Sequence, residues 1–125
     1  MTDLTDVVVD SLTVGGVAVA APTSHAYVAA GPIAETSGCV TLAKTVAGIM
    51  AMTLANPTAD TDDFKVLHIL NAQAQANYVT CTGGFGNGGS SYDVATFGAA
   101  VGNTLTVMAY QGYWYVIGAY GCTLG

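Results

Sequence analysis

The sequence predicts an all-β protein, built as a sandwich or small barrel of short antiparallel strands. Short runs rich in Val, Thr, Tyr and Ile recur along the chain between Gly, Pro, Asn and Asp residues, which is the pattern of strands and turns. Only 8% of the residues are charged and 52% are hydrophobic, whereas an ordinary soluble domain has about 25% charged residues. We therefore expect strands covered on both faces, partly by another copy, and an obligate oligomer.

The N-terminal part differs in composition from the rest of the chain. Its strands are predicted at 5–9, 12–20 and 25–29. Gly31 and Pro32 then open a loop. We therefore divide the chain into an N-terminal arm or added hairpin at 1–34, which contacts a partner, and a β-domain at 35–125.

The β-domain is predicted to contain seven further strands. They are expected at 38–43, 48–54, 64–70, 76–81, 92–97, 104–110 and 113–119. A helix over 35–55 is the alternative, but Gly38, Gly48 and several β-branched residues weaken it. The polar stretch 56–63 and the glycine-rich stretch 82–91 are expected to be connections between strands.

The last two predicted strands are apolar on both faces. A two-residue turn at Gln111-Gly112 places Tyr110 opposite Tyr113, Met108 opposite Tyr115 and Thr106 opposite Ile117 on one face. The other face then has Leu105, Val107 and Ala109 opposite Trp114, Val116 and Gly118.

The pattern does not say which hairpin face is the core. We assign Val107, Trp114, Val116 and Leu67 to the core. A subunit interface is assigned to Met108, Tyr113, Tyr115 and His68.

Charge and hydropathy disfavour several classes of partner. A net charge of −6 with two lysines and no arginine argues against nucleic-acid binding, which relies on Lys and Arg contacts to phosphate. The apolar runs at 46–55 and 113–120 are shorter than the roughly 20 residues of a membrane-spanning helix. The acidic N-terminus lacks the basic region of a secretory signal, so we expect synthesis in the cytoplasm and no membrane partner.

Three sequence patterns could indicate a catalytic, cofactor or metal site, and none fulfils its requirements. Gly84, Gly86 and Gly89 match G-x-G-x-x-G, but a strand pattern follows where a dinucleotide site needs a helix. An inter-strand loop is favoured, with Phe85 turned inward or contacting a neighbour. The other two patterns are a carboxylate cluster for calcium at Asp60, Asp62 and Asp63, and a hydrolytic set of His25, His68, Ser90, Ser91 and Asp93.

We favour structural readings of both these sets, and predict no catalytic, cofactor or metal site. The carboxylates are expected to form turn hydrogen bonds. No nucleophile elbow accompanies the serines. The three cysteines, Cys39, Cys81 and Cys122, are expected to be buried reduced thiols, with an intermolecular disulfide as the alternative.

Three features recur together within residues 50–119: the turn at Asp62 and Asp63, Thr96-Phe97-Gly98, and the closing hairpin TLTVMAYQGYWYVI. With these features the stretch resembles a module of tailed-bacteriophage structural proteins, namely capsid decoration proteins and head fibres. The resemblance implies a β-rich homotrimer located on the capsid surface of the virion, which binds the major capsid protein and stabilises capsid contacts.

In this interpretation the N-terminal strand would bind the capsid. We assign capsid binding by strand addition to Val7, Val8 and Val9. The alternative is a tail-fibre or head-fibre tip that binds a host receptor or glycan, for which exposed aromatic residues would form the platform.

Overall fold

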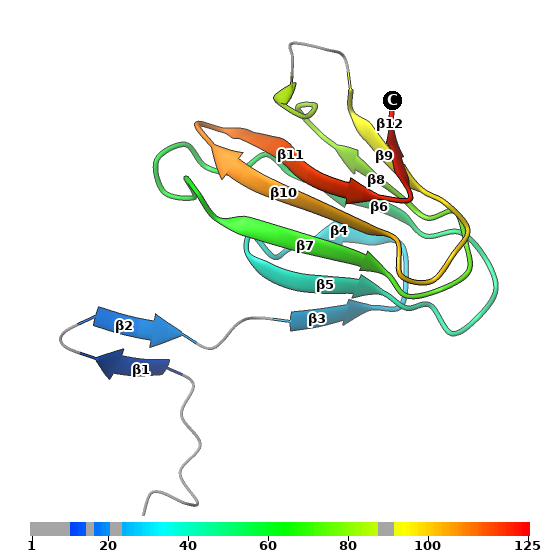
Figure 1. Ribbon diagram of the computed structural model, residues 1–125, viewed down its shortest axis with the longest axis horizontal. Helices are drawn as coiled ribbons and strands as arrows, with labels where there is room; N and C mark the ends of the chain where they lie inside the picture. The colour runs from blue at the N-terminus through cyan, green and yellow to red at the C-terminus, as the bar shows by residue number, and fades with distance from the viewer. Residues whose placement is uncertain (1–10, 15–16, 21–23, 88–91) are drawn as a thin grey trace, which may run out of the picture.

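The protein is an all-β sandwich of two five-stranded sheets, preceded by a separate two-stranded hairpin (Figure 1). The computed structural model describes residues 11–14, 17–20, 24–87 and 92–125. The strands are β1 Ser11–Val14, β2 Val17–Ala20, β3 Ser24–Tyr27, β4 Gly31–Ile33, β5 Gly38–Leu42, β6 Ala51–Leu54, β7 Val66–Asn71, β8 Tyr78–Cys81, β9 Val94–Phe97, β10 Thr104–Tyr110, β11 Tyr113–Tyr120 and β12 Cys122–Leu124. Sheet 1 has the order β11-β10-β7-β5-β3, and sheet 2 has the order β12-β9-β8-β6-β4.

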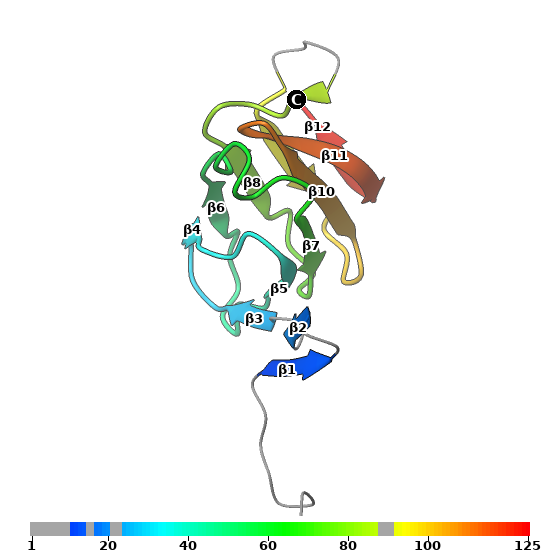
Figure 2. The same cartoon turned by 90° about the vertical axis from the view of Figure 1, so that its left-hand side faces the viewer.

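The chain alternates between the two sheets from β3 to β8. Strands β3, β5 and β7 are parallel neighbours in sheet 1, and β4, β6 and β8 are parallel neighbours in sheet 2. Parallel neighbours need a crossover connection, and here each crossover is a strand of the opposite sheet. The first six sandwich strands therefore form a three-turn coil with two facing layers, which Figure 2 shows side by side.

The last four strands add antiparallel pairs to this coil. Strand β9 pairs with β8 and β12 pairs with β9 in sheet 2, while β10 pairs with β7 and β11 with β10 in sheet 1. The predicted sandwich is confirmed, whereas the predicted barrel and wholly antiparallel pairing are wrong. Strand composition does not reveal which sheet each strand joins, because β-propensity reports how a side chain fits a pleated, half-buried surface and not which strand lies beside it.

Several predicted strand boundaries also change. The single strand expected at 12–20 is the hairpin β1–β2, and the loop expected after residue 30 contains β4. The short β12 was not predicted, and the strand expected at 5–9 lies outside the described residues. Strands β5 and β6 occupy the segment where a helix was the alternative.

The core lies between the two sheets and is almost entirely apolar. Leu67, Val107 and Trp114 are completely buried there, and Val116 packs against the core while half-buried. The Trp114 side of the last hairpin therefore faces inward, as assigned. The indole Nε1–H of Trp114 donates to the Ala55 carbonyl at 2.9 Å, so the one polar atom of this side chain is satisfied.

A buried amide network closes one end of the sandwich. Asn77 is completely buried, and its Oδ1 accepts from the Met50 amide at 2.7 Å while its Nδ2 donates to Asn71 Oδ1 at 2.8 Å. Asn71 is also completely buried and donates to the Gly98 carbonyl at 3.3 Å. Unpaired buried amides would cost about 1–3 kcal/mol each. The network therefore holds together the β5–β6, β7–β8 and β9–β10 connections.

Candidate assembly surface

The outer faces of the two sheets are uncharged. No described strand contains Asp, Glu, Lys or Arg. Because side chains alternate along a strand, every second residue of each sandwich strand points away from the core. The outer faces of the sheets therefore carry no charged side chains from the described strands.

The outer face of sheet 1 combines apolar and aromatic side chains with His68 and three threonines, Thr41, Thr104 and Thr106. Cross-strand pairing aligns Val66, Met108 and Tyr115 in one row, and His68 and Thr106 in the next. Its aromatic residues continue beyond the strands, since the Phe64 ring lies 5.7 Å from that of Tyr110, and the Tyr110 ring lies 6.4 Å from that of Tyr115, measured between ring centroids. These separations are typical of interacting aromatic pairs.

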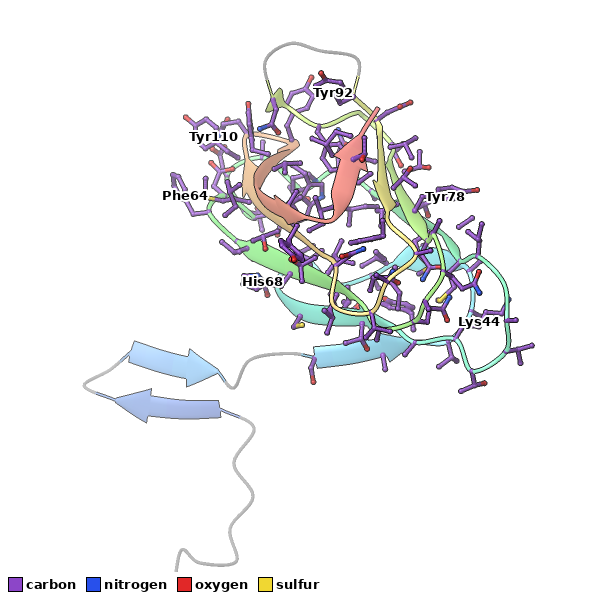
Figure 3. The ribbon with its side chains drawn as sticks, turned by 45° about the vertical axis from the view of Figure 1, so that its right-hand side comes forward. Lys44, Phe64, His68, Tyr78, Tyr92 and Tyr110 are labelled. Carbon is purple, nitrogen blue, oxygen red and sulfur yellow. The ribbon has the colours of Figure 1, made fainter. Side chains whose placement is uncertain are left out.

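Several of these apolar side chains are largely open to solvent. The exposed fraction is 67% for Phe64 and 72% for Tyr120. Tyr110, Tyr113 and Ile117 are exposed by about half. Figure 3 shows Phe64, Tyr110 and His68 on one side of the sandwich, with Tyr78 on the other. The structure thus gathers an apolar patch on sheet 1, which we call the aromatic face and define by Phe64, Met108, Tyr110, Tyr113, Tyr115, Ile117 and Tyr120.

The four residues assigned to a subunit interface all lie on this side of sheet 1. Met108, Tyr113, Tyr115 and His68 alternate with buried residues of β7, β10 and β11. His68 is exposed, and its Nδ1 lies 3.1 Å from Thr106 Oγ1. The predicted register is confirmed from the turn to Val107, which pairs with Val116.

Beyond Val107 the predicted register is wrong by one residue. Thr106 pairs with Gly118 and not with Ile117, because the register shifts between Thr106 and Val107. Such a bulge places an extra residue on one strand. Sequence alternation alone cannot reveal it, since alternation already placed Ile117 on the same face as Tyr113 and Tyr115.

The outer face of sheet 2 has a different composition. Its exposed or half-buried positions include four threonines on four neighbouring strands, Thr53, Thr80, Thr96 and Thr123. Tyr78 is its one outward aromatic among the described strand residues. Threonine hydroxyls can bond water, so this face can stay solvated without charge.

The carboxylates of the turn before β7 bind the chain itself. Asp63 Oδ1 accepts from the Gln111 amide at 2.7 Å, and Gln111 Nε2 donates to Asp63 Oδ2 and to Asp60 Oδ1, both at 2.6 Å. Asp62 accepts from the Thr58 amide at 2.7 Å and pairs with Lys65 Nζ at 2.8 Å. No group of metal-binding side chains occurs among the described residues, and the turn instead joins the end of the β10–β11 hairpin.

These contacts explain the acidity of two of the carboxyls. The hydrogen bond from Lys65, with that from the Thr58 amide, lowers the pKa of Asp62. The Gln111 amide lowers the pKa of Asp63. Both groups are therefore held as carboxylates. Asp62 closes the turn on itself through Thr58 and Lys65, and Asp63 joins the turn to Gln111 at the end of the β10–β11 hairpin.

The glycine-rich loop covers the edge of β11. Phe85 is buried, as one of the two alternatives expected, and the Gly86 amide donates to the Trp114 carbonyl at 2.8 Å. Asn87 acts as a side-chain substitute for a strand, because its Oδ1 accepts from the Val116 amide at 2.6 Å and its Nδ2 donates to the Val116 carbonyl at 3.0 Å. Sequence reasoning missed Asn87, since nothing local predicts its distant partner.

Gly86 packs closely against the aromatic face. A Cβ atom at this position would lie 2.6 Å from the Tyr115 ring, so any other residue here would displace that ring. The G-x-G-x-x-G match is thus explained here by packing at Gly86, and strand β9 follows it after residues that the structure does not describe.

The candidate hydrolytic residues are not assembled in the described part of the chain. His25 Nδ1 lies 3.0 Å from Glu35 Oε1, and the Tyr27 hydroxyl donates to the same carboxylate at 2.7–2.8 Å. Burial and the hydrogen bond to Glu35 raise the pKa of Tyr27, although the Ala34 amide opposes this. Ser90 and Ser91, as well as the proposed capsid contacts Val7, Val8 and Val9, lie outside the described residues.

The three cysteines are free thiols. Cys81 is buried and donates to the Gly84 carbonyl, while Cys39 and Cys122 are half-buried. Burial raises the pKa of both Cys81 and Cys122 to about 11. At neutral pH these two thiols are therefore protonated and unreactive.

No protein-family model matches any part of this chain, and no curated protein matches its sequence. Within the described residues, the structure has no helix of the length and apolarity needed to cross a membrane.

Proposed function

We propose that this protein is a self-assembling structural protein whose copies associate through the aromatic face of sheet 1. The observation that carries this proposal is the open cluster of Phe64, Tyr110 and Tyr113 on a sheet face without charge. Contiguous exposed apolar patches on soluble proteins mark interaction surfaces. Tyr and Met are also enriched in protein interfaces.

The biological setting we propose is the surface of a tailed-bacteriophage capsid. The support is the sequence resemblance over residues 50–119 to decoration and head-fibre modules. In this setting a homotrimer binds the major capsid protein, and Val7, Val8 and Val9 contribute a strand to the contact. A protein that binds only the assembled shell stabilises it by its binding free energy.

The association is tested by placing a charge on each outer face in turn. Tyr113→Asp is a cleaner probe than Tyr115→Asp, because the Tyr115 ring also covers Gly86. We expect Tyr113→Asp to raise the dissociation constant of the oligomer about 30-fold or more, since central interface tyrosines contribute about 2 kcal/mol. The matched control is Thr80→Asp on sheet 2, and the measurement is sedimentation velocity over a range of concentrations.

Two results would contradict the proposal. A wild-type chain that remains monomeric at high concentration rules out self-assembly. Equal effects of Tyr113→Asp and Thr80→Asp rule out the aromatic face as the contact. Binding of labelled protein to capsids or to host cells then distinguishes decoration from the alternative receptor-binding tip.

A further inference from the structure

The two sheets have four edge strands, and three of them carry a feature that opposes pairing along all or part of the strand. Strand β4 is three residues long and contains Pro32, which has no amide hydrogen to donate. Strand β12 is also three residues long. Strand β11 is covered over its first half by Gly86 and Asn87, which bond its Trp114 and Val116 backbone groups. No such bond covers its second half, 117–120, among the described residues. Short edges, proline and covering loops are the usual means of preventing edge pairing.

Among the residues that the structure describes, nothing protects the fourth edge strand, β3, in any of these ways. Strand β3 has β5 as its one neighbour, and Ser24, His25 and Ala26 are exposed. The Ala43 amide donates to the Tyr27 carbonyl at 2.8 Å, so Tyr27 directs its backbone groups toward β5. Because these groups alternate in direction along a strand, the amide and carbonyl of Ala26 point to the free edge.

The β1–β2 hairpin is complementary to this open edge, because it has only two strands and no third strand beside them. It forms a two-stranded sheet of its own, and its strands, SLTV and VAVA, contain no charge and no proline. An isolated two-stranded hairpin is marginally stable in water, and a third strand is what normally stabilises it. In Figure 1 the hairpin lies beyond the end of the sandwich.

We propose that the β1–β2 hairpin of one copy pairs with the β3 edge of a second copy. Strand β2 leads toward β3 of its own chain and does not run back beside it (Figure 1), so the hairpin remains available to another molecule. The pairing extends sheet 1 from five strands to seven. It is β-strand addition between identical chains, in which backbone hydrogen bonds supply the affinity. The inference rests on the proposed self-association and adds a second contact, distinct from the aromatic face.

Hydrogen exchange of the full-length chain tests this pairing directly. In a monomer the outward-pointing Ala26 amide exchanges rapidly, whereas in the assembled protein we expect its exchange to slow at least about tenfold. Unslowed exchange at concentrations where the protein is oligomeric would overturn the pairing while leaving the aromatic face intact. Protection of Ala26 that persists after dilution to monomer would also overturn it, because the hairpin would then pair with its own chain.

A pair of substitutions at Ala26 supplies the second test. Ala26→Pro removes the edge amide without removing a bond to β5, and Ala26→Ser is the matched control that keeps this amide. We expect the proline variant to weaken association at least about tenfold and the serine variant to associate like the wild type. Equal association of the two variants, with the unfolding transition of each unchanged, would contradict the proposal, as would a wild-type chain that never associates.

Discussion

The outer faces of sheet 1 and sheet 2 are alike in architecture and different in chemistry. Each face belongs to five strands, three parallel and two antiparallel, and neither contains a charged strand residue. Sheet 1 presents Met108, Tyr110 and Tyr113 to solvent, whereas sheet 2 presents two aligned pairs of threonines, Thr53 with Thr80 and Thr96 with Thr123. The same fold thus leaves one face suited to contact with protein and one suited to contact with water.

This difference shows that low charge by itself does not identify an interface. A threonine face bonds water through its hydroxyls, while an aromatic face gains free energy by leaving water, at about 25 cal/mol per Å² buried. Substitutions on the inner and outer faces of the two sheets should therefore differ in their effects on stability and association.

The largest effect on stability is expected from a substitution on the inner face of sheet 1. Trp114→Ala should lower the free energy of unfolding by about 3–5 kcal/mol, because it leaves a large cavity in the core. Tyr113→Ala, one residue away on the opposite face, should change it by less than about 1 kcal/mol. Urea denaturation at concentrations where both variants are monomeric makes the comparison, and similar losses would show that the assignment of the two faces is wrong.

Thiol reactivity should distinguish a core cysteine from one on the outer side of sheet 1. The pKa of Cys81 is about 11, against an ordinary 9.0, so its thiolate fraction at pH 8 is about a hundredfold lower than that of an ordinary thiol. Alkylation followed by mass spectrometry should find Cys81 correspondingly slow.

Cys39 then reports on assembly. It pairs with His68 across β5 and β7 on the outer side of sheet 1. We expect its labelling to slow at high protein concentration and to recover in Tyr113→Asp. Concentration-independent labelling of Cys39 would show that this part of sheet 1 stays open in the oligomer.

A smaller loss of stability is expected at acid pH, through protonation of Asp62 and Asp63 in the turn before β7. The folded-state pKa values of Asp62 and Asp63 are lowered from 3.8, so the unfolded chain binds more protons in acid. The stabilisation is complete above about pH 4 and is lost as the pH falls through the lower folded values. Unfolding free energies measured by urea should thus decline in acid, and the decline should be smaller in Asp62→Asn.

The control for the acid experiment is a carboxylate beside sheet 2, that of Asp93. Asp93 immediately precedes β9, and its carboxylate makes no hydrogen bond or ion pair with the described residues. Asp93→Asn should therefore keep the wild-type decline. An equal change in both variants would indicate a general charge effect and not the turn contacts.

The smallest effect is expected on the threonine face. Thr80→Val keeps the shape of an outward side chain on β8, so the unfolding free energy should change by no more than about 0.5 kcal/mol. Sedimentation should also remain that of the wild type. New association in this variant would show that the threonine hydroxyls are what prevents contact through sheet 2.

Local pattern predicted much of what lies within single segments. The last hairpin is one example, since its turn at Gln111-Gly112 and the pairing of Met108 with Tyr115 follow from alternation and turn chemistry. The same pattern placed Met108, Tyr113 and Tyr115 on one face. The local pattern could not predict the bulge at Ile117, because an extra residue in β11 depends on how that strand pairs with β10.

The sequence by itself determined that this chain is all-β, that its strands lack charge, and that its last hairpin has two apolar faces. Only the tertiary structure decided which of those faces is buried, how β3 to β8 alternate between sheets, and that Asn87 covers one edge while β3 remains open. The physical reason is that alternation and turn chemistry act over a few residues, whereas sheet order and edge exposure depend on hydrogen bonds between segments far apart in the chain.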